Sequence, residues 1–173
     1  KALAPSFGGI NLEDIAAPIC FEVEERLKKE LTIPVFHDDQ HGTAIVVLAG
    51  LINAVQMTGR KLKHCRIVCV GAGAAGTAII KLLHVYAEPD IIAVDSQGII
   101  SHDRPDLNEE KKKLLHYTNS SGLSGSLEEA LVGADIFIGV SSAGLLTAKM
   151  VKSMADDPII FAMANPAPEI MPA

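Results

Sequence analysis

Apolar residues recur at two different periods in the second part of this chain. Four short apolar runs alternate with segments whose apolar residues follow helical spacing, a pattern typical of parallel strands covered by helices. The predicted strands are Ile67–Val70, Ile91–Val94, Ile136–Val140 and Ile159–Met163. The predicted helices are Ala74–Tyr86, Asn108–Tyr117, a segment from the capping sequence at Ser126 to Gly133, and a short one capped by Thr147. This pattern predicts an α/β fold with a Rossmann-type, doubly wound parallel sheet.

The first part of the chain has a different pattern and is predicted to be a separate segment, residues 1–59, ahead of a domain at residues 60–173. Apolar and polar residues alternate from Ile10 to Ile15, which indicates a short strand. Pro18 suits the first turn of an amphipathic helix that runs to about Glu30. The stretch Gly42–Thr58 is rich in Ala, Val, Leu and Ile, which predicts a buried helix.

Composition excludes several classes of protein. With 173 residues and 49% hydrophobic content the chain can bury a core, and its net charge of −6 offers no basic surface for nucleic acid. The longest apolar run, residues 44–52, is too short to cross a bilayer. Cys20, Cys65 and Cys69 form neither an even set nor a CxxC pair, so we expect buried, reduced thiols in a cytoplasmic protein.

A glycine-rich turn follows the first predicted strand of the second domain. Its residues are Gly71, Ala72, Gly73, Ala74, Ala75 and Gly76, and the next strand ends at Asp95 and Ser96. In a dinucleotide-binding turn the first glycine permits the tight turn, the second lets the backbone approach a pyrophosphate, and the third allows the helix to pack on the strand. These residues are therefore the candidate cofactor-binding set.

The acid at the end of the second strand bears on the choice of cofactor. Asp95 would accept a hydrogen bond from a ribose 2′-hydroxyl and repel a 2′-phosphate, which favours NAD over NADP. Ser96, Arg104 and Lys111–Lys113 would accommodate a phosphate instead if the following loop folded back. Both cofactors therefore remain candidates.

A cluster of acids and histidines, His37–His41, lies where an apolar run gives way to a helix. It does not match the zinc pattern HExxH, because His37 precedes any helix and its acidic neighbour is Asp. Carboxylates from Glu13, Asp14 and one of Asp38 and Asp39 suit Mg²⁺ or Mn²⁺ better. A metal site predicts that these acids converge, whereas ordinary surface acids would stay apart.

Asn165 follows the last predicted strand and precedes Pro166. The carboxyl ends of strands are where open α/β sheets bind ligands. Asn and Pro are also common turn formers, so spacing alone favours an ordinary turn.

Six separated motifs carry a family resemblance that covers almost the whole chain. They are FGGINLEDI, IPVFHDDQHGTA, GAGAAG, VDSQG, IGVSSAGLLT and FAMANPAPEIMP. Together they resemble bacterial-type malic enzyme. The resemblance implies oxidative decarboxylation of L-malate to pyruvate and CO₂ with NAD or NADP and Mg²⁺ or Mn²⁺, in a homo-oligomer such as a homodimer.

The resemblance also implies roles for individual residues. Glu13, Asp14 and Asp39 resemble the metal ligands of the family, and Asp38 resembles the acid that supports its catalytic lysine. Asn165 resembles the asparagine that reaches substrate and nicotinamide, which raises it above a simple turn residue. His37 and His41, in the same cluster, match no family role.

The lysine base and tyrosine acid of the family belong to a region that precedes Phe7 and is not in this sequence. We therefore expect this chain alone to bind a dinucleotide without turning over malate. Two other classes remain open. A regulatory dinucleotide-binding module would use only the glycine turn, and a metal-free dehydrogenase would leave the paired acids without a purpose.

Overall fold

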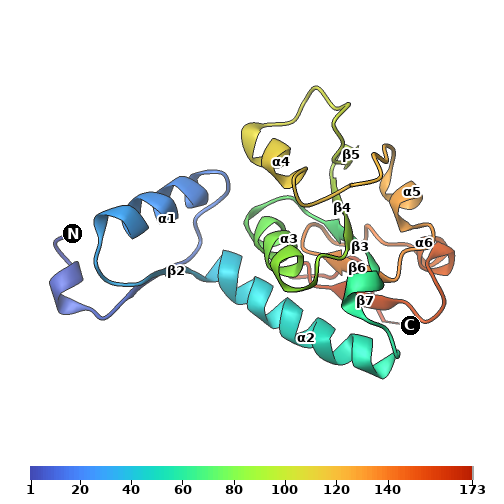
Figure 1. The fold of residues 1–173 in the computed structure, drawn as a ribbon, viewed down its shortest axis with the longest axis horizontal. Coiled ribbons are helices and arrows are strands. Elements are labelled where there is room, and N and C mark those ends of the chain that lie inside the picture. Colours follow the sequence, from blue (N-terminus) through green and yellow to red (C-terminus); the bar gives the residue numbers. More distant parts are fainter. Residues whose placement is uncertain (173) are drawn as a thin grey trace.

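Four strands of the main sheet are apolar at nearly every position because helices cover both faces of the sheet. They are β3 (Arg66–Val70), β4 (Asp90–Asp95), β6 (Ile136–Gly139) and β7 (Ile159–Ala162). In the computed structural model, which describes residues 1–172, the strand order is β5-β4-β3-β6-β7 (Figure 1). The pairs β3–β4, β3–β6 and β6–β7 are parallel, so the predicted doubly wound sheet is confirmed.

Successive residues of each strand feed two hydrophobic cores, one on each face of the sheet. Ile67 and Cys69 of β3 pack toward α2 (Thr43–Met57) and α3 (Ala74–Ala87). Val68 of β3 points to the other face of the sheet, where it packs in one core with residues of α5 (Leu127–Leu131) and α6 (Ala148–Ser153). The capping residues predicted for these last two helices, Ser126 and Thr147, are confirmed.

Two elements of the main body differ from the prediction. The antiparallel edge strand β5 (Gly98–Ile99) was not predicted, because two residues are too few to show a periodic pattern. Helix α4 (Glu109–Leu114) is shorter than predicted, and the side chain of Asn108 caps it by accepting a hydrogen bond from the backbone N–H of Lys111.

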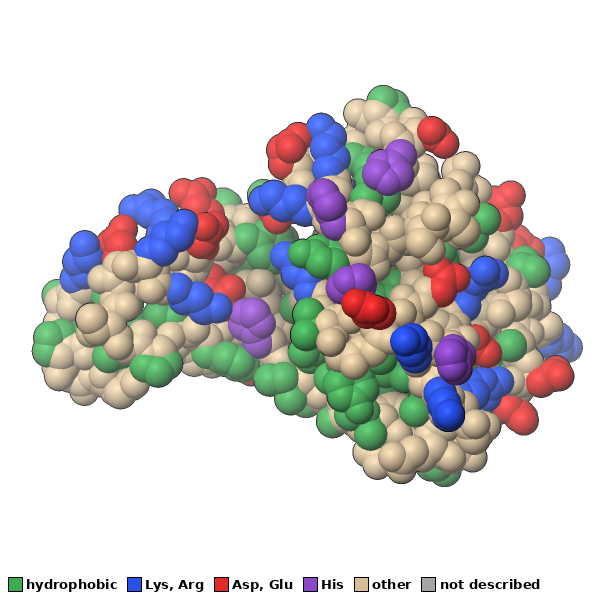
Figure 2. All heavy atoms as spheres, in the orientation of Figure 1, with side chains coloured by type: hydrophobic (Ala, Val, Ile, Leu, Met, Phe, Trp, Pro, Cys, Tyr) green, Lys and Arg blue, Asp and Glu red, His purple; other side chains and the backbone are tan. Residues whose placement is uncertain are grey.

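The N-terminal segment forms an arm beside the main body (Figure 1). Strand β1 (Ile10–Leu12) pairs in parallel with β2 (Val35–His37), and α1 (Ile19–Glu30) connects them. A π-helical turn, Asp38–Gly42, then joins β2 to α2. A cleft of 720 Å³ lies between the arm and α3, and Figure 2 shows it as the notch between the two masses of the molecule.

Helix α2 was predicted to be buried, but only one face of it is. Val47 and Leu51 are enclosed in the core, whereas Ile45, Val46 and Met57 are exposed. Because α2 packs on α3 and β7, it shares the core of the second predicted domain. The domain boundary at residue 60 stays a prediction.

All three cysteines are buried free thiols, as predicted. Complete burial raises the pKa of Cys69 to about 12, so this thiol is protonated and chemically inert at neutral pH. Within residues 1–172, no helix combines the length and the apolar character needed to cross a membrane.

Candidate functional site

The loops at the carboxyl ends of β3 and β6 lie side by side where the sheet changes direction. From β3 the chain continues to β4 on one side, and β6 later pairs on the other side. Such a switch point opens the crevice in which α/β sheets bind ligands. The backbone N–H of Gly71 donates to the carbonyl of Val94, and that of Val140 donates to the carbonyl of Val70. These bonds fix the two loops to the sheet.

The three glycines of the turn meet three different steric situations. Gly71 has a φ of +110°, and a Cβ there would lie 2.7 Å from the carbonyl oxygen of Val140. A Cβ on Gly76 would overlap the carbonyl oxygen of Gly71. A Cβ on Gly73, by contrast, would meet no atom of residues 1–172 within 4 Å. Gly71 and Gly76 are therefore required by the fold. Gly73 borders open space, which is necessary at the position where a pyrophosphate approaches the backbone.

Helix α3 begins at this turn without a side-chain cap in the described part of the chain. Its first backbone N–H groups are thus free to bind an anion, and the helix dipole adds to that preference. The candidate residues Ala72, Ala74 and Ala75 contribute backbone rather than side-chain groups here. The predicted glycine turn consequently has the geometry that a dinucleotide requires.

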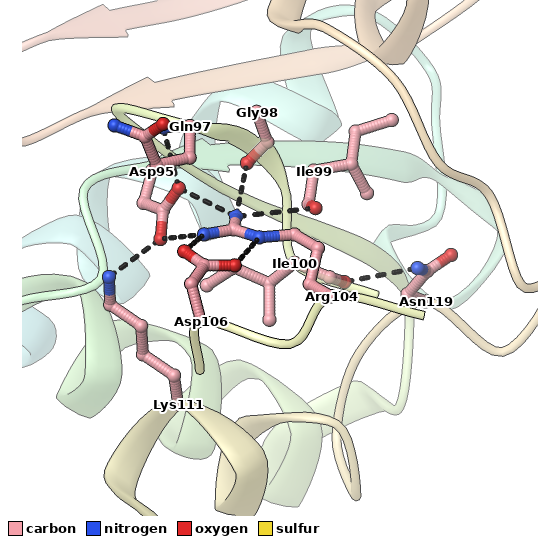
Figure 3. Close-up of polar contacts among 9 residues, drawn as sticks. All are labelled: Asp95, Gln97, Gly98, Ile99, Ile100, Arg104, Asp106, Lys111 and Asn119. Carbon is pink, nitrogen blue, oxygen red and sulfur yellow. Dashed lines mark hydrogen bonds and ion pairs between the residues drawn. The ribbon is translucent and has the colours of Figure 1, made fainter. Parts of the chain in front are cut away.

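Asp95 is fully occupied by other residues of the chain (Figure 3). Its Oδ1 accepts hydrogen bonds from Nη1 of Arg104 at 2.7 Å and from the backbone N–H of Gln97 at 2.9 Å. Its Oδ2 accepts from Nη2 of Arg104 at 3.1 Å and from Nζ of Lys111 at 2.6 Å. A carboxylate has about four lone-pair positions, and all are used. Asp95 therefore has no acceptor left for a ribose hydroxyl.

The same contacts set the charge of Asp95. Its side chain is only 7% exposed, and burial by itself would raise its pKa. Hydrogen bonds from Arg104 and Lys111 outweigh burial and hold the pKa below its ordinary value. Arg104 also donates to Asp106, so two acids and two bases form one balanced cluster. Asp95, the acid that favoured NAD, is thus neutralised by Arg104 and Lys111, which were candidates for binding a 2′-phosphate. The predicted preference for NAD therefore loses its support.

A cavity of 430 Å³ opens beside this cluster, between the ends of β4 and β6. It is lined by Val70, Val94, Asp95, Ser96, Gln97, Gly98, Ser126, Leu127, Ser141, Ser142 and Leu145. Ser96 is exposed there, consistent with its place in the candidate cofactor set. Its lining is both polar and apolar, and it includes Val70, the residue before the glycine turn.

The acids proposed as metal ligands are only partly brought together. The backbone N–H of Asp14 donates to Oδ2 of Asp39 at 2.9 Å, which joins the two loops although they lie 25 residues apart. Glu13 is exposed, and nowhere in residues 1–172 do three acids, histidines or cysteines gather closely enough to hold a metal ion. The donor chemistry fits a hard cation, but the predicted convergence of Glu13, Asp14 and Asp39 is not present in this structure.

The turn that carries Asp38 and Asp39 is fastened from α1. Oε1 of Glu24, a nearly buried carboxylate, lies 2.6 Å from Nε2 of His41 and 2.7 Å from Nζ of Lys28. Burial opposes ionisation of Glu24, but the hydrogen bonds from Lys28 and His41 prevail and lower its pKa. His41 thus has a structural contact that the sequence did not reveal. The exposed carboxylate of Asp38 lies over Gly42, where a Cβ would overlap Oδ1.

Asn165 lies exposed just beyond the carboxyl end of β7, where the sequence predicted it. The residue that sequence reasoning missed is Glu169, four positions later in the same motif. It is completely buried and accepts hydrogen bonds from the backbone N–H groups of Ser141 and Ala164. The available signal was the motif FAMANPAPEIMP itself, but a glutamate beside two prolines indicates an exposed turn by composition.

Comparison with known proteins decides the family. Residues 40–171 match the family model described as malic enzyme, NAD binding domain. The chain belongs to the malic enzyme family. It is 61% identical over 173 residues to the bifunctional malic/malolactic enzyme of Bacillus subtilis (strain 168) and 53% identical over 175 residues to the NADP-dependent malic enzyme of Rhizobium meliloti (strain 1021).

Solved structures give the same result. The crystal structure of the NAD-dependent malic enzyme from Thermotoga maritima superposes with a TM-score of 0.94 at 50% identity. The alignments cover 99% of this chain but only 42% of the Bacillus protein, 22% of the Rhizobium protein and 46% of the Thermotoga chain. The chain therefore spans less than half the length of these malic enzymes. Since they include both NAD- and NADP-dependent proteins, family membership does not decide the cofactor.

Proposed function

We propose that the full-length protein containing this chain catalyses NAD- or NADP-dependent oxidative decarboxylation of L-malate to pyruvate and CO₂ with Mg²⁺ or Mn²⁺. The observation that carries the proposal is the glycine turn, in which Gly71 and Gly76 are sterically required while Gly73 borders open space, in a chain of this family. A homo-oligomeric, cytoplasmic protein is part of the same proposal.

Each of the chain's own residues would have a role that follows from its position in the site. The backbone N–H groups at the start of α3 hold the pyrophosphate, and the loop after β6 borders the same crevice. Asn165, exposed at the end of β7, orients the substrate beside the nicotinamide by hydrogen bonding from its amide. Asp38 would orient the family's lysine base by accepting a hydrogen bond from it. A bound dinucleotide supplies the hydride acceptor, and a divalent cation supplies positive charge beside the substrate oxygens.

Glu13, Asp14 and Asp39 are the residues proposed to hold the cation. Support comes from their oxygen chemistry and from the hydrogen bond between the backbone N–H of Asp14 and Oδ2 of Asp39, while Glu13 is exposed. A regulatory dinucleotide-binding module is the competing function, and it would leave these acids without a role.

Calorimetry with Mn²⁺ in the presence of dinucleotide distinguishes the two functions. Asp39→Ala should weaken Mn²⁺ binding by about 10-fold or more, because it removes one carboxylate ligand from a small set. Glu22→Ala is the matched control, since Glu22 is an exposed acid on α1 with only a loose pairing to Arg26. Equal Mn²⁺ binding by wild type and Asp39→Ala would favour the regulatory module and contradict the metal assignment.

A further inference from the structure

Glu169 is a buried carboxylate to which the proposed mechanism gives no part. Its exposed fraction is 0%. Oε1 accepts a hydrogen bond from the backbone N–H of Ser141 at 3.1 Å, and Oε2 accepts one from the backbone N–H of Ala164 at 3.1 Å. Among residues 1–172 no lysine, arginine or histidine forms an ion pair with it. A carboxyl group buried in this way is costly unless its oxygens are hydrogen-bonded.

The fold makes room for this carboxylate at one place. A Cβ on Gly139, the last residue of β6, would overlap the carboxyl group of Glu169 and lie 2.6 Å from its Oε2. The backbone around Glu169 is held as well, since Leu146 donates to the carbonyl of Glu169 at 3.0 Å and Gly144 donates to that of Pro168 at 3.1 Å. The side chain is thus inserted between the carboxyl ends of β6 and β7.

Its two hydrogen bonds join the two loops that border the second half of the crevice. Ser141 follows Val140, whose carbonyl lies against the glycine turn, and Ala164 directly precedes Asn165. In a doubly wound sheet, the second mononucleotide half of a dinucleotide lies over these later strands. Because each carboxyl oxygen accepts from a different loop, this one side chain joins both loops.

We propose that Glu169 is a positioning residue that holds Asn165 at the correct distance from the nicotinamide end of the crevice. This inference rests on the proposed function. Glu169 holds the loop that carries Asn165 directly, through Ala164, but touches the dinucleotide crevice only at its border, through Ser141. Its loss should therefore lower turnover more than dinucleotide affinity. Displacement of a reacting group by about 1 Å can cost on the order of 100-fold in rate.

Glu169→Gln is the first test variant, made in the full-length protein. The amide keeps the size of the side chain but has one acceptor oxygen, and its NH₂ group would face a backbone N–H. We expect kcat for malate to fall by about 10- to 100-fold while the Kd for the dinucleotide changes by less than about threefold. Gly139→Ala displaces the carboxylate without removing it, so it should also lower kcat while leaving the Kd for the dinucleotide nearly unchanged. It replaces Glu169→Gln as the test variant if Glu169→Gln does not fold.

Asp135→Asn is the matched control. Asp135 precedes the same strand at its other end, where Oδ2 accepts a hydrogen bond from the backbone N–H of Arg66 at 2.8 Å. It should lower thermal stability without lowering kcat. The positioning role would be overturned if kcat for malate were the same in Glu169→Gln, Gly139→Ala and Asp135→Asn. A wild-type protein that produces no NAD(P)H from malate would instead overturn the proposed function, and this inference with it.

Discussion

Gly73→Val is expected to weaken dinucleotide binding on the order of 100-fold while leaving the thermal stability of the chain almost unchanged. The position has an extended backbone with φ −86°, which valine adopts readily, and a Cβ there meets no atom of residues 1–172 within 4 Å. The side chain would instead fill the space through which a pyrophosphate reaches the first N–H groups of α3. Fluorescence or calorimetric titration of wild type and variant with NAD and NADP measures the difference.

Gly76→Ala is the matched comparison in the same turn. Its Cβ would overlap the carbonyl oxygen of Gly71, a backbone atom that cannot move without disturbing β3. We expect a loss of about 1–3 kcal/mol in the free energy of unfolding, together with the loss of dinucleotide binding. Two results would contradict the assignment of Gly73 to the pyrophosphate. One is that Gly73→Val destabilises the chain as much as Gly76→Ala does. The other is that Gly73→Val binds dinucleotide as tightly as wild type.

Asp95→Asn is expected to cost about 2–4 kcal/mol of unfolding free energy at pH 7, because it leaves Arg104 and Lys111 without their shared carboxylate. Urea unfolding of wild type and variant measures the difference. Asp106→Asn is the control: Asp106 is 48% exposed and pairs only with Arg104 among these cations, so we expect a loss below about 1 kcal/mol.

The contribution of Asp95 should also depend on pH in a defined direction. The folded-state pKa of Asp95 lies below its ordinary value, so the folded state binds fewer protons than the unfolded state at mildly acid pH. Its stabilisation is therefore complete above the unfolded pKa of about 3.9 and is lost as the pH falls through the lower, folded pKa. The difference between wild type and Asp95→Asn should be constant from about pH 7 to pH 5 and shrink below about pH 4. A difference that instead grew on acidification would contradict the ion-paired cluster.

The strands of the main sheet could be predicted because most positions of the apolar runs are buried. Three of its helices could be predicted because Asn108, Ser126 and Thr147 cap them. The contacts of Asp95 could not. Arg104 and Lys111 lie 9 and 16 residues further on, and only the fold of the intervening loop brings them back to the carboxylate. Local sequence identifies an acid at the end of a strand but not whether its acceptors are already used.

The contacts of the acidic loop and of Glu169 could not be predicted from local sequence either. The adjacent acids at Asp38 and Asp39 stand out in the sequence, yet only Asp39 contacts another of the predicted ligands, Asp14. Glu169 does not stand out, and its burial depends on the absence of a side chain at Gly139, which is distant in sequence. Pairing of charges and burial of a polar residue are both settled by tertiary contacts.

We expect this chain to bind a nicotinamide dinucleotide across the carboxyl ends of β3, β4 and β6. Titration of the isotope-labelled chain with NAD and with NADP, followed by the chemical shifts of backbone amides, tests it most directly. We expect the largest shifts at Gly71–Gly76, with Ser96 and Ser141 also affected. Shifts confined to the opposite edge of the sheet, or no shifts with either dinucleotide, would contradict it.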